Sequence, residues 1–170
     1  EIHGKTTRLD LQASIHGREI GFDGFAQFYK GYYNVNPEDF VDWEGNIFPQ
    51  LPDMKMISMG LNAFYIFNSE NFSYKAAFTR KPVQLKSAGS FTLGIFGLLD
   101  ESTTENGFIP KEFPDSIRTS FDLKSFSTLA YGISIGYLYT WVISEHFFLN
   151  FGVTPGFGNN RSELENLDGQ

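Results

Sequence analysis

Residues 130 to 158 alternate large apolar side chains with small ones at every second position. Steps of two from Tyr131 give Ile133, Ile135, Tyr137, Tyr139, Trp141 and Ile143, and the positions between them are mostly small: Ala130, Gly132, Ser134, Gly136, Leu138 and Thr140. A period of two is that of a β-strand, whose successive side chains point to opposite faces. This stretch therefore predicts a strand with one bulky apolar face and one face of small residues.

The same period recurs along most of the chain and predicts seven strands of roughly 9–15 residues. They cover residues 8–16, 19–32, 55–68, 71–80, 90–99, 130–143 and 147–158. No stretch shows a helical period, and 19 Phe, 8 Tyr and 17 Gly suit strands with bends or close approaches. The sequence predicts an all-β chain with a single domain over residues 1–170.

The connections between these strands are of two lengths. Residues 16–18, 68–71 and 144–146 make tight turns, whereas residues 34–53 and 100–120 are long and rich in Pro, Gly and acidic residues. Such a pattern is typical of an antiparallel up-and-down β-barrel. With seven strands, the turn at 144–146 falls at the wrong end of the barrel. We therefore expect a short eighth strand within residues 118–126, and no closing strand in the polar tail after residue 158.

Both membrane barrels and soluble ligand-binding barrels have alternating strands, so strand length and aromatic placement decide between them. The predicted strands reach the ~9–11 residues that span a bilayer at a tilt near 45°. Ten residue steps from Tyr131 to Trp141 project to about 25 Å along the barrel axis, the height of the lipid-facing band. Large rings crowd one face, and a small soluble barrel has little room for them inside. The sequence predicts a transmembrane β-barrel, with a soluble lipocalin-like barrel as the alternative.

This interpretation assigns residues to each face of the barrel. The lipid-facing aromatic girdle is expected to include Tyr65, Phe67, Phe72, Tyr74, Tyr131, Tyr137, Tyr139 and Trp141. The candidate lumen charges are Arg8, Asp10, Glu19, Asp23 and Lys75. On the lipid face only Lys30 and Arg80 are charged, and both lie near strand ends, where a long basic side chain can reach the interface.

Charge and composition exclude several classes of protein. A net charge of −7 argues against a nucleic-acid surface, which needs a basic footprint. The absence of cysteine excludes disulfides, zinc–thiolate sites and thiol nucleophiles. No apolar run approaches the ~20 residues of a spanning helix. No signal peptide is visible, and since a strand pattern begins close to Glu1, we expect the precursor to carry one.

Catalytic and metal chemistry find little support in the sequence. The three histidines, His3, His16 and His146, do not define a Ser-His-acid set, and no enzymatic activity is expected. The acidic loop at residues 36–46 lacks the spacing of a calcium loop, so a solvated loop is the simpler interpretation, and no metal or cofactor is expected. In residues 86–90, Lys86 could pair with a lumen carboxylate, or Gly89 could simply ease the start of a strand.

Several stretches resemble an uncharacterised outer-membrane β-barrel family of Bacteroidota, of the domain of unknown function 4421 type. They are residues 27–33, 65–78, 86–94, 132–141 and 147–158, and the likeness extends from about Arg8 to Gly158. The resemblance implies a secreted, membrane-inserted barrel in a Gram-negative envelope. It also implies that this chain is an interior piece of a longer barrel. No catalytic residue can be carried over from the family.

The function stays open between three classes at this point. A structural or surface-interaction barrel predicts a filled lumen, a narrow passive channel predicts solute flux through it, and a soluble carrier predicts binding of an apolar ligand. We expect the chain in the outer membrane, with the lipid bilayer as partner and the barrel-assembly machinery engaged during biogenesis. No nucleic-acid partner is expected.

Overall fold

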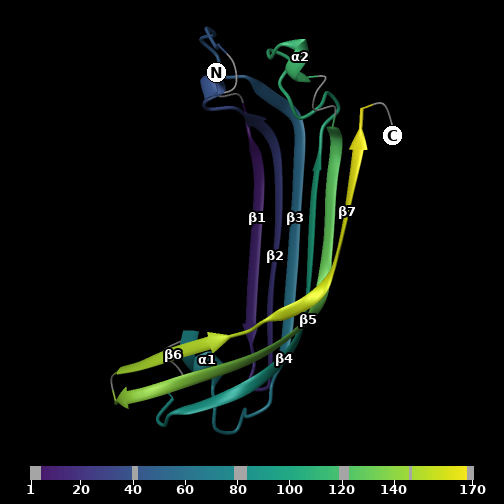
Figure 1. Cartoon of the computed structure of the whole chain (residues 1–170). Helices are drawn as coiled ribbons and strands as arrows, with labels where there is room; N and C mark the ends of the chain where they lie inside the picture. Colours follow the sequence, from purple (N-terminus) through teal and green to yellow (C-terminus); the bar gives the residue numbers. More distant parts are fainter. Residues whose placement is uncertain (1–4, 40–41, 79–83, 119–122, 146, 168–170) are drawn as a thin grey trace.

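The chain folds into an antiparallel sheet that curls into an open half-barrel, as its computed structural model shows (Figure 1). The structure describes residues 5–39, 42–78, 84–118, 123–145 and 147–167. Its strands are β1 (Thr7–His16), β2 (Ile20–Tyr33), β3 (Gln50–Ile66), β4 (Ala88–Thr103), β5 (Leu123–Ser144), β6 (Phe147–Val153) and β7 (Gly156–Asn166). The short helices are η1 (Pro37–Asp39), α1 (Tyr74–Phe78) and α2 (Asp115–Arg118). The all-β prediction is confirmed.

Every strand pairs with its neighbour in the chain, in the order β1-β2-β3-β4-β5-β6. The long strand β5 also pairs with β7, which runs along its N-terminal half while β6 runs along its C-terminal half. β6 and β7 thus follow β5 as one path that is interrupted at residues 154–155. The interruption lies at Pro155, which has no N–H to donate, while its carbonyl accepts a hydrogen bond from the N–H of Ile135 at 3.1 Å.

Two sequence predictions about the C-terminal part need correction. The predicted strand 147–158 is divided into β6 and β7, and the polar tail that we expected to be irregular continues β7 to Asn166. Because β7 pairs with β5 from Gly156 to Asn166, its backbone hydrogen bonds hold the strand although its side chains are polar.

The predicted strand 71–80 is also wrong, because Tyr74–Phe78 forms the helix α1. Ser73 caps this helix: its Oγ accepts a hydrogen bond from the N–H of Ala76 at 3.3 Å. Phe72 and Ala76, four residues apart, are 3% exposed each. Their spacing fits one buried side of a helical turn as well as it fits a strand.

Removing that strand resolves the mismatch between turns and barrel ends. The β1–β2 turn, the β3–β4 connection and the β5–β6 turn all lie at one end, called the turn end below (Figure 1). The β2–β3 and β4–β5 loops lie at the other end, called the loop end. The expected eighth strand in residues 118–126 is not seen in the described part of that segment, where Leu123 already begins β5.

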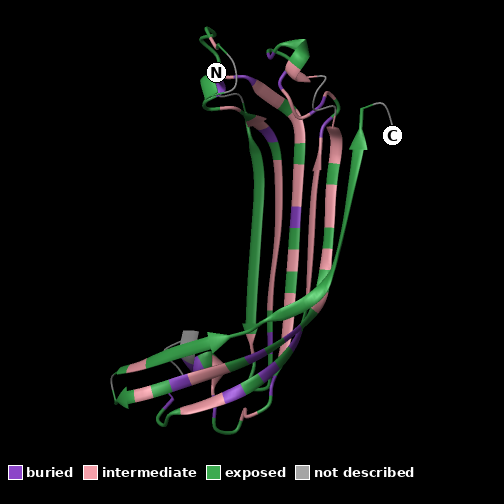
Figure 2. Cartoon of the chain, viewed as in Figure 1, coloured by how far each residue is buried: buried purple, intermediate pink, exposed green. Residues whose placement is uncertain are grey.

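Both outer strands of the sheet are exposed along their length, as Figure 2 shows for β1 and β7. In the strands between them, exposed and less exposed residues alternate, most clearly in β3 and β5. The alternation that defined the strands in the sequence is therefore an alternation between two structurally different faces.

Candidate functional site: the two faces of the sheet

One face of the sheet carries the large apolar side chains and is exposed. Strand register places Ile133 opposite Ile95, and Ile135 opposite Leu93, so apolar side chains lie side by side across strands. Ile133 and Ile135 are 51% exposed each, and Ile95 is 57% exposed. Apolar residues this exposed are ordinary when single, but a continuous patch over several strands marks a contact surface. We call it the apolar face.

Most of the aromatic residues predicted for a girdle share this face. Tyr131, Tyr137, Tyr139 and Trp141 alternate along β5, and Tyr65 opposes Leu93 in the same face. Ring pairs connect strands or neighbours within it: Phe91 and Tyr137 have centroids 4.9 Å apart, and Tyr65 and Phe67 5.2 Å apart. Phe67 is 59% exposed just beyond β3.

Phe72 and Tyr74 lie elsewhere. Phe72 is 3% exposed, and the Tyr74 ring packs edge-on against His16 and Phe64, each with centroids 4.9 Å apart. His16 and Phe64 belong to the opposite face of the sheet, because each aligns with Gly21 across the strands. The predicted strand over residues 71–80 is absent from the described part of that segment: Phe72 lies just before α1, and Tyr74 begins the helix.

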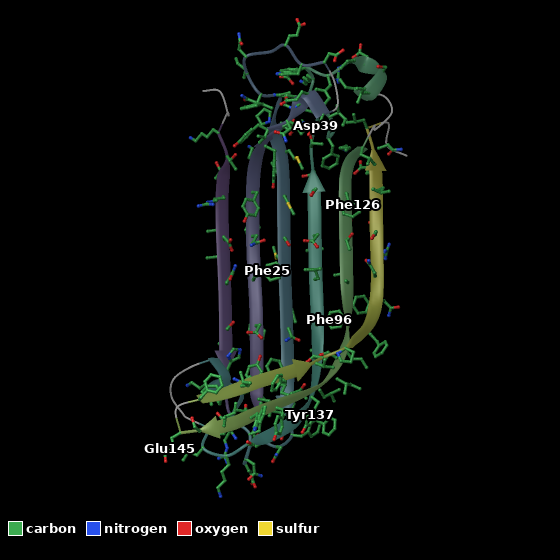
Figure 3. All side chains as sticks on the ribbon, turned by 60° about the vertical axis from the view of Figure 1, so that its left-hand side comes forward. Phe25, Asp39, Phe96, Phe126, Tyr137 and Glu145 are labelled. Atoms are coloured by element: carbon green, nitrogen blue, oxygen red, sulfur yellow. The ribbon has the colours of Figure 1, made fainter. Side chains whose placement is uncertain are left out.

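The opposite face is concave and holds rings that lie over glycines. Phe64 opposes Gly21, Phe25 opposes Gly60, and Phe96 opposes Gly132. A Cβ added at Gly60 would lie 2.3 Å from the Phe25 ring, and one at Gly21 would lie 2.1 Å from the Phe64 ring. Figure 3 shows Phe25 and Phe96 on their strands. Glycine thus leaves the space that each facing ring fills, which supports the curl of the sheet.

A row of polar residues crosses the whole concave face, one from each successive strand. It runs through Asp10, Gln27, Ser58, Asp100, Thr128 and Ser162. Hydrogen bonds join neighbours in the row: Gln27 Nε2 donates to Asp10 Oδ2 at 3.3 Å, and Ser58 Oγ donates to a carboxylate oxygen of Asp100. The concave face is therefore crossed by a polar row toward its loop end, which would line the lumen of a closed barrel there.

The predicted lumen charges fall into two groups. Arg8, Asp10 and Asp23 lie on the concave face, where His16 Nε2 is 3.0 Å from Asp23 Oδ1. Glu19 lies in the β1–β2 turn, and Lys75 lies exposed on α1. Lys30 is on the apolar face at its loop end, and Arg80 lies outside the described residues. The prediction that only these two charged residues share the face is incomplete, because Lys55 opposes Lys30 and Glu101 opposes Ile57 on the same face.

Sequence reasoning missed Asp100 as a lumen charge, because the predicted strand ended at residue 99. Continuing the period of two along β4 would have placed Asp100 on the concave face. It also missed a cavity of about 570 Å³ on this face, whose lining includes Gln12, Asp23, Gln27 and Asn62.

The two long loops pack together at the loop end. Trp43 of one loop and Phe113 of the other have ring centroids 6.3 Å apart, and Phe113 is 6% exposed. Tyr33, at the end of β2, packs against Phe48 with centroids 6.1 Å apart. The loop end therefore has a small apolar core of its own.

Asp53, near the start of β3 and outside the apolar face, anchors the β4–β5 loop. Its Oδ2 accepts hydrogen bonds from Thr104 Oγ1 at 3.0 Å, the N–H of Glu105 at 2.8 Å and Asn106 Nδ2 at 3.0 Å. Partial burial by itself would raise the pKa of Asp53, but these hydrogen bonds to the charged form outweigh it and hold the pKa below its ordinary value.

This anchor predicts an acid-sensitive loop. Because the folded-state pKa is lowered, the stabilisation is complete above the ordinary value of 3.8 and is lost as pH falls through the lowered value. We expect proteolytic cleavage within residues 104–107 to rise below about pH 4. Asp53→Ala should show the raised cleavage already at pH 7, and Asp39→Ala in the other loop should not. Equal cleavage of Asp53→Ala and wild type at pH 7 would contradict the anchor.

The described residues show no catalytic or metal centre. No group of three or more His, Asp or Glu among them could hold a metal ion, and this includes the described part of the acidic loop. Lys86 is exposed ahead of β4, and its carbonyl accepts a hydrogen bond from Gln84 at 3.0 Å. A Cβ at Gly89 would lie 2.5 Å from the Tyr137 hydroxyl, so this glycine eases the start of β4.

Comparison with known proteins supplies a family but no function. None of the helices in the described part of the chain has the length and hydropathy needed to cross a membrane. Neither the curated proteins nor the solved structures contain a match to this chain. One family model does match, over residues 1–169, and the chain therefore belongs to the family described as a domain of unknown function, DUF4421.

Proposed function

We propose that this chain is part of an integral outer-membrane β-barrel whose apolar face contacts lipid and whose concave face forms a polar lumen. Its role is structural or in surface interaction, without catalysis. The observation that carries the proposal is the shape of the apolar face, which is bounded at the loop end by a slanted line of polar residues. The boundary can be traced through the strand register.

The first polar residue of the face moves toward the turn end from β1 to β7, in two steps. Thr7, Lys30 and Lys55 share one row in β1, β2 and β3. In β4 and β5 the boundary is Glu101 opposite Ser127, two residues closer to the turn end. In β7 it is Asn159, which opposes Tyr131, four residues closer still.

The slant matches strands that cross a flat slab at an angle. The boundary shifts by six residues in total over the five strand-to-strand steps from β1 to β7. At the residue rise and strand spacing of a β-sheet, this shift is about 20 Å along the strands over about 24 Å across them. The corresponding angle is roughly 40°, within the ~35–45° tilt of membrane barrels. A planar lipid boundary accounts for this line, whereas a water-exposed surface would not need an apolar face at all.

The arrangement of the faces also bears on the alternatives. A soluble carrier for an apolar ligand needs its apolar face inward, and here the polar row occupies the concave face. A narrow passive channel is favoured by that same polar row, so conductance is the property that separates it from a structural barrel.

Membrane fractionation tests the proposal directly. The protein, expressed from its complete gene in a Gram-negative host, should be found in the outer membrane, and its gel mobility should change on boiling because a closed barrel resists detergent until heated. Recovery in the soluble fraction, with the same mobility before and after boiling, would overturn the proposal.

A further inference from the structure

The β3–β4 connection enters the concave side of the sheet instead of passing around its end. After β3, the chain turns at residues 67–71, where the N–H of Phe72 donates to the carbonyl of Asn68 at 2.9 Å. The Tyr74 ring then packs against His16 and Phe64, so one side of the segment rests on β1 and β3. Figure 1 shows α1 at the turn end, where β6 crosses the lower part of the sheet.

A cavity of about 310 Å³ lies between the same segment and the opposite wall of the half-barrel. Phe72 and Tyr74 line this cavity together with Leu138 of β5 and Asn150 and Gly152 of β6. These wall residues belong to the concave face, because Leu138 opposes Gly152 and Thr140 opposes Asn150 in rows that continue the glycine-lined side. The segment of residues 68–78 therefore places Phe72 and Tyr74 between two walls of the half-barrel, one made by β1 and β3 and the other by β5 and β6.

Gln84 fixes the segment in this position from the other side of the connection. Its Oε1 accepts a hydrogen bond from the N–H of Ser73 at 2.8 Å, and its Nε2 donates to the carbonyls of Asn71 at 2.7 Å and Lys86 at 3.0 Å. Gln84 is 7% exposed. A buried amide with these hydrogen bonds is costly to displace, because displacement would break all three at once.

A second amide holds the start of the segment to β4. Asn68 Nδ2 donates to the carbonyl of Gly89 at 2.8 Å, and the N–H of Asn68 donates to Ser90 Oγ at 2.9 Å. Ser90 is 2% exposed. The segment is thus tied by side chains at both ends and by aromatic packing in the middle.

We propose that residues 68–78 are a plug that closes the turn end of the lumen. This inference rests on the proposed membrane barrel and adds that its lumen is closed at the turn end and open only at the loop end. The cavity on the concave face, lined by Gln12, Asp23 and Asn62 together with Phe25 and Phe96, then opens only toward the loop end. A closed lumen leaves the structural or surface-interaction role and excludes passive flow through the barrel.

Ion conductance of the purified protein in planar bilayers tests the plug. Wild type should show no conductance steps, and the double variant Phe72→Ala/Tyr74→Ala should raise the current on the order of tenfold or more, because it removes the two rings that occupy the space between the walls. Glu70→Ala, an exposed change in the same segment, is the matched control and should behave as wild type. Equal conductance of wild type and the double variant would overturn the plug.

Gln84→Ala provides a second route if the double variant fails to assemble. It keeps both rings and removes the three hydrogen bonds of the amide, so we expect brief openings that wild type lacks. Every protein is first checked for a heat-dependent shift in gel mobility. Insertion together with steady wild-type conductance refutes the plug alone, whereas the absence of insertion for wild type refutes the membrane barrel and the plug together.

Discussion

Replacing Ile135 with arginine should keep the chain from assembling in the outer membrane. Ile135 is 51% exposed near the middle of the apolar stretch of β5, which runs from Leu129 to Ile143 on this face. If that face contacts lipid, the new charge lies near the bilayer midplane, where Arg or Lys costs ~2–4 kcal/mol in a membrane barrel. We expect a large loss of the heat-shifting band from the outer-membrane fraction.

Ser127→Arg is the matched control for this substitution. Ser127 lies on the same face of the same strand, beyond the polar boundary, and it opposes Glu101 and Glu163 on its two neighbours. An arginine there meets water and carboxylates, so assembly should equal that of wild type. Normal assembly of Ile135→Arg would show that the face does not contact lipid.

Gly132→Ala should strongly destabilise the sheet. A Cβ at this position would lie 2.2 Å from the Phe157 carbonyl oxygen and 2.7 Å from the Gly158 Cα. Both are backbone atoms of β7, so no side chain can move aside, and the pairing of β5 with β7 must shift. We expect a loss of stability beyond the ~1–3 kcal/mol typical of overpacking, measured as the urea midpoint of unfolding in detergent.

Gly97→Ala is the comparison that isolates the effect. At Gly97 the nearest atom to an added Cβ is Leu61 Cγ at 3.8 Å, an ordinary contact. Gly97 opposes Tyr131, which directly precedes Gly132 in β5, so the two glycines sit at nearly the same height of the sheet. Similar urea midpoints for the two variants would mean that β5 and β7 do not approach closely at Gly132.

The strands and their faces could be predicted from the sequence because the two faces of the sheet have different surroundings. Residues of different character therefore alternate along each strand with a period of two. Wherever one side chain faces an exposed apolar surface and the next faces a crowded interior, as along β5, the pattern is visible without tertiary information. The glycines of the concave face were also visible, but their facing rings, such as Phe25 over Gly60, depend on strand register.

The plug and β7 escaped prediction for opposite physical reasons. Tyr74 and Phe72 alternate as in a strand, yet they are enclosed by walls that come from distant parts of the chain, and that enclosure leaves no local signal. In β7 the strand continues past the apolar face, where its outward residues Asn159, Arg161 and Glu163 need no hydrophobicity. The pattern ends there although the backbone pairing does not.

The nearest-neighbour order of the sheet has a kinetic consequence. Because each strand from β2 to β6 pairs with the strand before it in the chain, and β7 pairs with β5 alongside β6, the sheet can grow hairpin by hairpin. Each added hairpin closes only the loop between consecutive strands, and the entropy cost of closure rises slowly with loop length. A chain with such local contacts can fold in sequence order as it is delivered, without waiting for a distant segment to arrive.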